Sequence, residues 1–409
     1  MNNSAIKITL FINYFVFAIL LNSVGIVMTQ SIDVFGVNES QASVLEAFKD
    51  LPIAIISFLV ASFLPRFGYK NAMLTALALV FTGCLIMAWG NSFFYTKILF
   101  LIIGISFALI KLSVYSLIGV LTSNAKEHSS LMSSIEGFFM IGIALAYFIF
   151  PAFISETNPD SWLNVYYVLA ALIAISFIVL LFSKVTYKEE ATGANILDDI
   201  KKSAKLIIIP LVLVFLASAF FFVMMEQGIM TWLPHFNKKI FSFNNTLAIQ
   251  MASILALTLA IGRFLAGYLT KRINWVYIVV ACVLISGGIL LVVLPQLKAT
   301  AGSLSQIDSI TDIPLLGFIL PLIGLFIAPI YPLLNSTVLS ALPKRLHSPM
   351  SGLIIIFSAL GGTIGSRIVG ELFHKVGGAN AFYFLLIPMG LLIVFVLITD
   401  KLSKKEIQI

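Results

Sequence analysis

Long apolar runs recur from one end of this 409-residue chain to the other. Each run holds roughly 18–25 residues, the length that a helix needs to cross the ~30 Å hydrocarbon core of a bilayer. The runs lie near residues 8–30, 42–63, 71–91, 97–122, 130–152, 162–183, 206–234, 246–269, 275–295, 313–340, 349–372 and 380–399. The sequence therefore predicts an all-α, polytopic membrane protein with 12 transmembrane helices.

Composition argues against a water-soluble globule. Hydrophobic residues make up 60% of the chain and charged residues 11%, against roughly 45–50% and about 25% in soluble domains. The first run follows Lys7, but it is longer than a signal-peptide core and lacks a small-residue cleavage site, so we interpret it as the first span. Cys84 and Cys282 both fall inside apolar runs, which indicates neither a disulfide framework nor a metal site.

The distribution of basic residues predicts the topology. With an even number of spans, the loops on the side of the termini hold seventeen of the 25 Lys and Arg residues, and the opposite loops hold five. The positive-inside rule then places both termini in the cytoplasm of a multi-pass protein of the plasma or inner membrane. This bias also explains the net charge of +7, so no nucleic-acid partner is expected.

The longest hydrophilic interruption divides the chain near its middle. We expect an N-terminal six-helix bundle at 1–183, a cytoplasmic linker at 184–205 and a C-terminal six-helix bundle at 206–409. No Walker motif and no catalytic constellation occur in the sequence, so we expect neither ATP hydrolysis nor another enzymatic activity. No cofactor and no metal are expected, and the four histidines are too scattered for a metal site.

Short basic loops follow the second and the eighth spans. The first loop reads ASFLPRFGYK and contains Arg66, Gly68 and Lys70; the second reads GYLTKRINW and contains Arg272. Arg66 and Arg272 lie 206 residues apart, as a repeat of the two halves predicts. Basic loops are expected where two helices turn tightly at an anionic cytoplasmic leaflet.

Six plus six spans, a central linker and these loops resemble the major facilitator superfamily over essentially the whole chain. The first loop is similar to a degenerate form of that family's signature. Pro65 stands where the family usually has Asp, so the charge interaction between helices that is associated with that Asp is not expected here. The resemblance implies two bundles that rock against each other and expose a central site alternately to each side of the membrane.

The end of the eighth span is closer to the fucose:proton symporter branch of that family. The stretch IGRFLAGYL, with Gly262, Arg263 and Gly267, is similar to that branch's G-R-F-x-x-G-x-L pattern, as are Tyr331-Pro332 and Gly361-Gly362. That branch is known for acidic residues in the first and fourth spans, where this chain has Ser23 and Lys111. Fucose and the same proton carrier are therefore not carried over.

Charged groups inside the second span need a partner or a function. An ionisable group at bilayer depth costs at least ~2.5–3.5 kcal/mol on insertion scales. Glu46, Lys49 and Asp50 are spaced by three and four residues, so they project to one side of a helix. Two interpretations remain open: a structural Glu46–Lys49 pair near the outer end, or titration of Asp50 or Glu46 during transport.

Two further charge pairs are predicted, one from similar depth on two spans and one from helical spacing within a single span. Lys111 in the fourth span and Glu136 in the fifth either form a structural tie or act in transport, with Lys111 binding an anionic part of the substrate or being released when Glu136 takes a proton. Arg367 and Glu371 in the eleventh span are four residues apart, and we interpret them as a snorkelling pair near the outer end.

The seventh span carries Glu226-Gln227 in its outer half, followed by Gly228 and Pro234. These residues predict a broken helix, the kind of element in which transporter sites tend to lie. Sugar carriers of the resembled superfamily commonly use polar residues of this span, which implies a ligand role for Glu226 and Gln227. Deep neutral groups that need a partner add further candidates, namely Asn22, Tyr115, Tyr331 and Asn335.

We therefore interpret the chain as a secondary active transporter of a small polar solute, a sugar or related nutrient, that works by proton-coupled symport. The proton-coupling candidates are Asp50, Glu46, Glu136 and Glu226. The substrate-binding candidates are Asn22, Lys49, Lys111, Tyr115, Glu226, Gln227, Tyr331 and Asn335. The candidates for gating or loop structure are Arg66, Gly68, Lys70, Gly262, Arg263, Gly267 and Arg272.

Other functions stay open at this point. A proton-driven exporter of drugs or metabolites is the main alternative within transporters, although such carriers tend to have more apolar cavities than these charges indicate. A membrane-embedded enzyme or a sensor is the alternative outside transport. The partners that we expect are a small-molecule substrate, protons and the lipid bilayer, with the protein acting as a monomer.

Overall fold

The structure of the protein is a computed structural model. It describes residues 4–60, 64–122, 125–155, 157–183, 205–270, 272–300, 306–342 and 347–404. The predicted linker at 184–205, apart from its last residue, lies outside the described residues. Within the described residues, the regular structure is helical apart from one isolated bridge between Phe243 and Ile307.

The helices before the linker form the N-terminal half. They are α1 (Ser4–Asn22), α2 (Val24–Phe35), α3 (Glu39–Ala42), α4 (Val44–Val60), α5 (Leu64–Phe67), α6 (Tyr69–Trp89), α7 (Phe93–Leu121), α8 (Ala125–Ile149), η1 (Pro151–Phe153), η2 (Pro159–Asn164) and α9 (Val165–Phe182).

The first span is bent by 41° between α1 and α2. The Asn22 amide donates to the carbonyl of Ala18, and the Ser23 hydroxyl donates to the carbonyl of Leu20. Such side chains compete with the helical backbone for its acceptors and often bend helices. Gly36 then ends α2 with a φ of 66°, in the left-handed region that favours glycine.

The helices after the linker form the C-terminal half. They are α11 (Pro210–Ile240), α12 (Asn245–Leu269), α13 (Trp275–Thr300), η3 (Ile310–Asp312), α14 (Leu315–Ile319), η4 (Leu320–Leu322), α15 (Ile323–Ile327), α16 (Ile330–Ala341), α17 (His347–Val376), α18 (Gly378–Tyr383) and α19 (Leu386–Ser403).

The broken span of this half is the tenth and not the seventh. The prediction of a break near Gly228 and Pro234 was wrong, because α11 runs without interruption through both. The tenth span is instead divided among α14, η4, α15 and α16, where Pro321 and Pro329 lack the N–H that a continuous helix needs.

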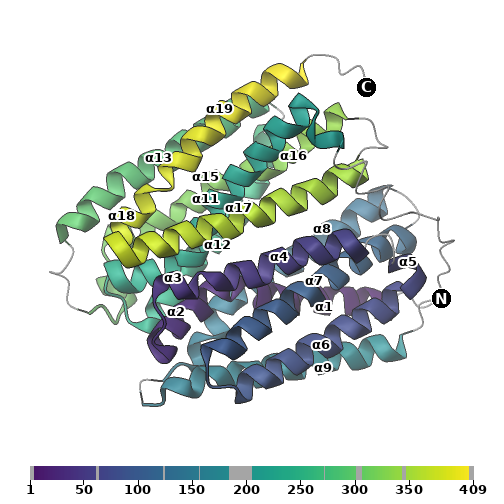
Figure 1. The fold of residues 1–409 in the computed structure, drawn as a ribbon, viewed down its shortest axis with the longest axis horizontal. Coiled ribbons are helices and arrows are strands. Elements are labelled where there is room, and N and C mark those ends of the chain that lie inside the picture. Colours follow the sequence, from purple (N-terminus) through teal and green to yellow (C-terminus); the bar gives the residue numbers. More distant parts are fainter. Residues whose placement is uncertain are drawn as a thin grey trace.

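The helix count agrees with the predicted architecture. In the described part of the chain, ten helical segments are long and apolar enough to cross a membrane, and the bent α1–α2 pair adds an eleventh. The twelfth is α4, which has 17 residues and carries Glu46, Lys49 and Asp50. It lies in the row of long helices between α7 and α17 (Figure 1). The predicted 12-helix, all-α membrane fold is therefore confirmed.

Helices of the same half pack mainly on one another (Figure 1). In the N-terminal half the main contacts are α6 with α7 and α9, α4 with α7, and α1 with α8; in the C-terminal half, α11 packs on α17, α19 and α12. The two halves touch mainly through α4 and α3 on α17, α2 on α11, and α8 on α12. A polar group on these four contacts lies between the halves.

Candidate functional site

Three charged residues of α4 form a buried cluster, called the triad below: Glu46, Lys49 and Asp50. The Lys49 ammonium pairs with the Glu46 carboxylate, and its Nζ lies 3.5 Å from Asp50 Oδ1. The exposed fractions are 0% for Glu46, 5% for Lys49 and 8% for Asp50. The structure thus has the Glu46–Lys49 pair and adds Asp50 to it. One cation faces two carboxylates, so the triad carries a net negative charge unless one carboxylate holds a proton.

The triad faces the other half of the molecule. Thr231 Oγ1 on α11 donates a 3.1 Å hydrogen bond to Glu46 Oε2. Gly362 on α17 lies so close that a Cβ there would be 3.0 Å from Asp50 Oδ2 and 3.1 Å from Gln227 Cγ. Both triad carboxylates are therefore in contact with helices that belong to the C-terminal half.

A second polar cluster lies within the N-terminal half. The Tyr115 hydroxyl donates a 2.8 Å hydrogen bond to Glu136 Oε1. The Lys111 ammonium lies 5.9 Å from the ring centroids of both Phe107 and Tyr115, within cation–π range. Tyr14 adds a ring 6.1 Å from that of Tyr115.

The predicted Lys111–Glu136 pair is not formed in this conformation. The two charges interact at longer range, but among the described residues no ion pair within 4.0 Å joins them. Tyr115 satisfies the Glu136 carboxylate, and two aromatic faces hold Lys111. The structure thus places Lys111, Tyr115 and Glu136 in one cluster, with a tyrosine between the acid and the base.

A third cluster lies in the C-terminal half. Glu226 on α11 is close enough to Arg263 on α12 to interact with its charge. The Tyr331 hydroxyl shares a 3.1 Å hydrogen bond with Ser358 Oγ, and its ring stacks on Phe222 at 5.5 Å. Asn335 Oδ1 is buried and has no hydrogen-bond partner among the described residues. Glu226, Tyr331 and Asn335 are each only partly buried as whole residues.

The remaining candidates of the N-terminal half make contacts within that half. The Asn22 amide is used at the bend of the first span. Lys70 donates to the carbonyls of Leu181 (2.9 Å) and Ser183 (2.7 Å) and so ties the start of α6 to the end of α9. Gly68 precedes α6 with a φ of 87°. The side chain of Arg66 and the surroundings of Gly267 lie outside what the structure describes.

The candidates at the end of α12 and in the loop after it make packing contacts, and one of them reaches the other half. A Cβ on Gly262 would lie 2.4 Å from the carbonyl oxygen of Leu325, so only glycine allows α12 to approach α15 this closely. Arg263 Nη1 lies 3.7 Å from Met140 Sδ on α8 of the other half. Arg272 lies over the ring of Tyr268 at 5.5 Å.

Sequence reasoning missed a set of polar contacts that joins the halves at one end of the molecule. The set, called the latch below, pairs Asp33 with Lys238, and Glu39 with both His235 (3.3 Å) and His374 (3.4 Å). The Arg367 guanidinium donates to the Ser40 carbonyl and to Ser43 Oγ. This end is the one predicted to face outward, and it is called the closed end.

The latch changes the predicted role of Arg367 and buries His235. Arg367 does approach Glu371, with 3.9 Å between Nη2 and Oε2, but its guanidinium mainly binds α3 of the other half. His235 is almost fully buried, at 1% exposed, and lies against Trp232. Trp232 is itself buried and donates to the carbonyl of Ser366. No single motif marked these residues, because each falls in a predicted loop or near the end of a predicted span.

The latch makes a pH-dependent contribution to stability. The hydrogen bond from His235, offset in part by burial, lowers the pKa of the Glu39 carboxyl from 4.5 to about 2. A carboxyl whose pKa is lowered by folding stabilises the fold above its unfolded pKa, and this stabilisation is lost as the pH falls towards the folded value. The melting temperature of Glu39→Gln should therefore lie below that of the wild type at pH 6 and approach it near pH 3.

Thermal unfolding of the detergent-solubilised protein at both pH values checks this expectation. Asp160→Asn is the matched control, because Asp160 accepts a hydrogen bond from Asn91 within the N-terminal half. A difference between Glu39→Gln and the wild type that stays constant from pH 6 to pH 3 would show that Glu39 is not held as a carboxylate by its histidines.

Two helical halves that close on buried charges define a membrane transporter, and comparisons identify its family. The Major Facilitator Superfamily model matches residues 8–366. The chain therefore belongs to the major facilitator superfamily, as its loops and span number predicted. No curated protein sequence matches the chain.

Solved structures with the same fold cover nearly the whole chain. A bacterial homologue of the human lysosomal transporter Spinster, inward-facing and occupied, is 15% identical, with a TM-score of 0.68 over 98% of this chain and 96% of its own. FucP in the outward conformation is 15% identical, with a TM-score of 0.63 over 98% and 99%. A D-xylose-proton symporter is 15% identical, with a TM-score of 0.71 over 99% of both chains. At these identities the likeness shows the fold alone.

Proposed function

We propose that this transporter moves a small polar solute between its two halves and couples that movement to protons, as a symporter. The observation that carries the proposal is the triad, a cluster with one cation and two carboxylates, buried where α4 meets α11 and α17. Burying charge is costly. A pair alone would neutralise Lys49, so the second carboxylate calls for a role beyond structure.

Asp50 is the triad member that we assign to proton exchange. Glu46 accepts hydrogen bonds from both Lys49 and Thr231, so its carboxylate is held by two partners. Asp50 lies farther from Lys49, at 3.5 Å, and beside Gly362 of the other half. Taking up one proton makes the triad neutral and weakens its hold on the ammonium. A contact that changes with protonation at the surface between the halves is what proton coupling to alternating access requires.

Polar side chains of both halves support a polar substrate. Lys111, Tyr115 and Glu136 in one half and Glu226, Gln227 and Tyr331 in the other are partly exposed, although they lie along transmembrane helices. A solute rich in hydroxyl groups would find donors and acceptors in both clusters. The sugar carriers among the solved structures with this fold, such as the D-xylose-proton symporter, agree with this substrate class.

A counterflow assay tests the proposed function. Proteoliposomes loaded with unlabelled sugars, amino acids or organic anions should take up the matching labelled solute for one class, and we expect that class to be sugars or polyols. If the folded, reconstituted protein exchanges none of these solutes, the proposal that it transports a small polar solute is contradicted.

Tyr331→Phe tests the substrate role of the C-terminal cluster. Loss of one hydrogen bond of about 1 kcal/mol should raise the half-saturating substrate concentration about fivefold, with the maximal exchange rate little changed. Tyr277→Phe is the matched control, because Tyr277 on α13 is exposed. Equal half-saturation in both variants would remove Tyr331 from the substrate site.

A further inference from the structure

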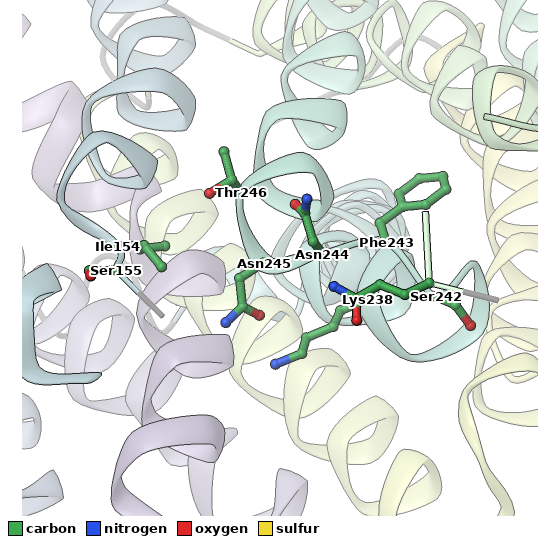
Figure 2. A pocket seen from close by; sticks show the side chains of 9 residues that line it. Ile154, Ser155, Lys238, Ser242, Phe243, Asn244, Asn245 and Thr246 are labelled. Atoms are coloured by element: carbon green, nitrogen blue, oxygen red, sulfur yellow. The ribbon is translucent and has the colours of Figure 1, made fainter. Parts of the chain in front are cut away.

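A polar cavity lies at the closed end, apart from the three clusters described above (Figure 2). Its volume is about 540 Å³, within the roughly 300–1,000 Å³ typical of small-molecule sites. Ile154 and Ser155 come from the N-terminal half, and the other lining residues come from the C-terminal half, namely Lys238, Ser242, Phe243, Asn244, Asn245, Thr246 and Gln306. A ligand in this cavity would touch both halves.

The wall contributed by the C-terminal half is held in place by hydrogen bonds. Ile307 N–H donates to the carbonyl of Ser242 (2.9 Å), and Asn244 N–H donates to the carbonyl of Ile307 (3.1 Å). The Asn244 side chain also donates to Asp308 (3.0 Å). Ser242 keeps a φ of 59°, a left-handed conformation that costs a residue with a side chain about 1–2 kcal/mol. The wall is thus preformed, as ligand sites usually are.

The chemistry of the lining favours an uncharged ligand rich in hydroxyl groups. Hydroxyls and amides predominate, and the charged member, Lys238, is paired with Asp33. Asn245 Oδ1 is buried, and no described group donates to it. The amide groups of the lining, those of Asn244, Asn245 and Gln306, are the kind of group that pairs with ligand hydroxyls. A polyol or sugar supplies such donors and also accepts bonds from Thr246 and Ser242.

We propose that this cavity is a second binding site, for a small uncharged polyol or sugar, and that it exists only while the closed end is closed. Ser155 and Asn245 belong to different halves, so separating the halves divides the lining. Lys238 belongs both to the lining and to the latch. An occupied cavity therefore stabilises the closed end and slows its opening, whether or not the same compound is carried through the central site.

Cysteine labelling of the full-length protein in detergent tests this site. Both natural cysteines, Cys84 and Cys282, are buried, so Thr246→Cys supplies the accessible thiol. Glucose, sorbitol or inositol at millimolar concentration should slow maleimide labelling at least fivefold, whereas betaine at equal osmolality should not. Thr157→Cys, exposed and outside the lining, is the matched control and should label at an unchanged rate.

Asn245→Leu separates this site from the central one. Added to Thr246→Cys, it should abolish protection while leaving substrate counterflow intact, because Asn245 belongs to none of the three clusters. Failure of every polyol to protect Thr246→Cys overturns the inference, and so does protection that persists in Asn245→Leu, which would arise from the central site. Absence of counterflow by the wild type would instead contradict the proposed function and not the second site.

Discussion

Replacing Lys49 by methionine should lower the free energy of unfolding by about 3–5 kcal/mol, the usual cost of removing one partner from a buried ion pair, and should abolish transport. The substitution leaves Glu46 and Asp50 buried one turn apart without their cation. Because no described basic side chain other than Lys49 lies within 4.0 Å of either carboxylate, neither charge finds another ionic partner.

Two controls separate charge from packing in this experiment. Lys375→Met removes an exposed partner of Glu371 and should change stability far less than Lys49→Met does, because solvent screens such pairs. The triple variant Glu46→Gln/Lys49→Met/Asp50→Asn removes all three charges and should recover much of the stability without recovering proton coupling. Denaturant unfolding in mixed micelles provides the measurement, and a Lys49→Met protein as stable as Lys375→Met would contradict the triad's role.

Gly25→Val should hold the two halves apart at the end where the latch now joins them. Gly25 on α2 packs against α11 of the other half, and a Cβ at this position would lie 2.3 Å from the carbonyl oxygen of Thr231. That atom belongs to the backbone and cannot move aside as a flexible side chain could. The clash exists only in the state in which α2 and α11 are in contact. Overpacking costs about 1–3 kcal/mol, which reduces the population of that state roughly 5- to 150-fold. Transport should fall accordingly.

Spin labels report this change directly. Cysteines at exposed Thr157 and Thr311 mark the two halves at the closed end. Their distance distribution should shift to longer values in Gly25→Val. Gly288→Val is the matched control, because nothing lies within 4 Å of a Cβ at Gly288. Wild-type distances and wild-type exchange in Gly25→Val would show that the halves do not separate at this contact.

Much of the fold followed from the sequence because the bilayer imposes a length and a polarity on every span. Those constraints act on each span separately, so span number, the all-helical class and the family could be predicted. The continuity of α11 could not. Gly228 and Pro234 weaken a helix in isolation, but α2, α12, α17 and α19 pack on α11, which stays helical through both residues.

The grouping of the candidate residues was predictable only where all of them lie on one helix. The spacing of Glu46, Lys49 and Asp50 places them on one side of α4 whatever the neighbours are. Lys111 and Glu136 lie on different helices, so similar depth did not determine that Tyr115 would come between them. The latch joins segments that are distant in sequence, such as Glu39 with His235 and His374. Only the packing of the two halves brings such residues together.

Uphill accumulation in proteoliposomes under an imposed proton gradient tests the central claim, that a buried acid between the halves carries the coupled proton. The wild type should accumulate its substrate. Asp50→Asn should lose accumulation and keep counterflow, because a neutral side chain still lets the halves rock but carries no exchangeable proton. If Asp50→Asn accumulates substrate as the wild type does, the assignment of the coupled proton to this buried acid is contradicted. If Glu46→Gln, Glu136→Gln and Glu226→Gln do so as well, the proton-coupling account as a whole is contradicted.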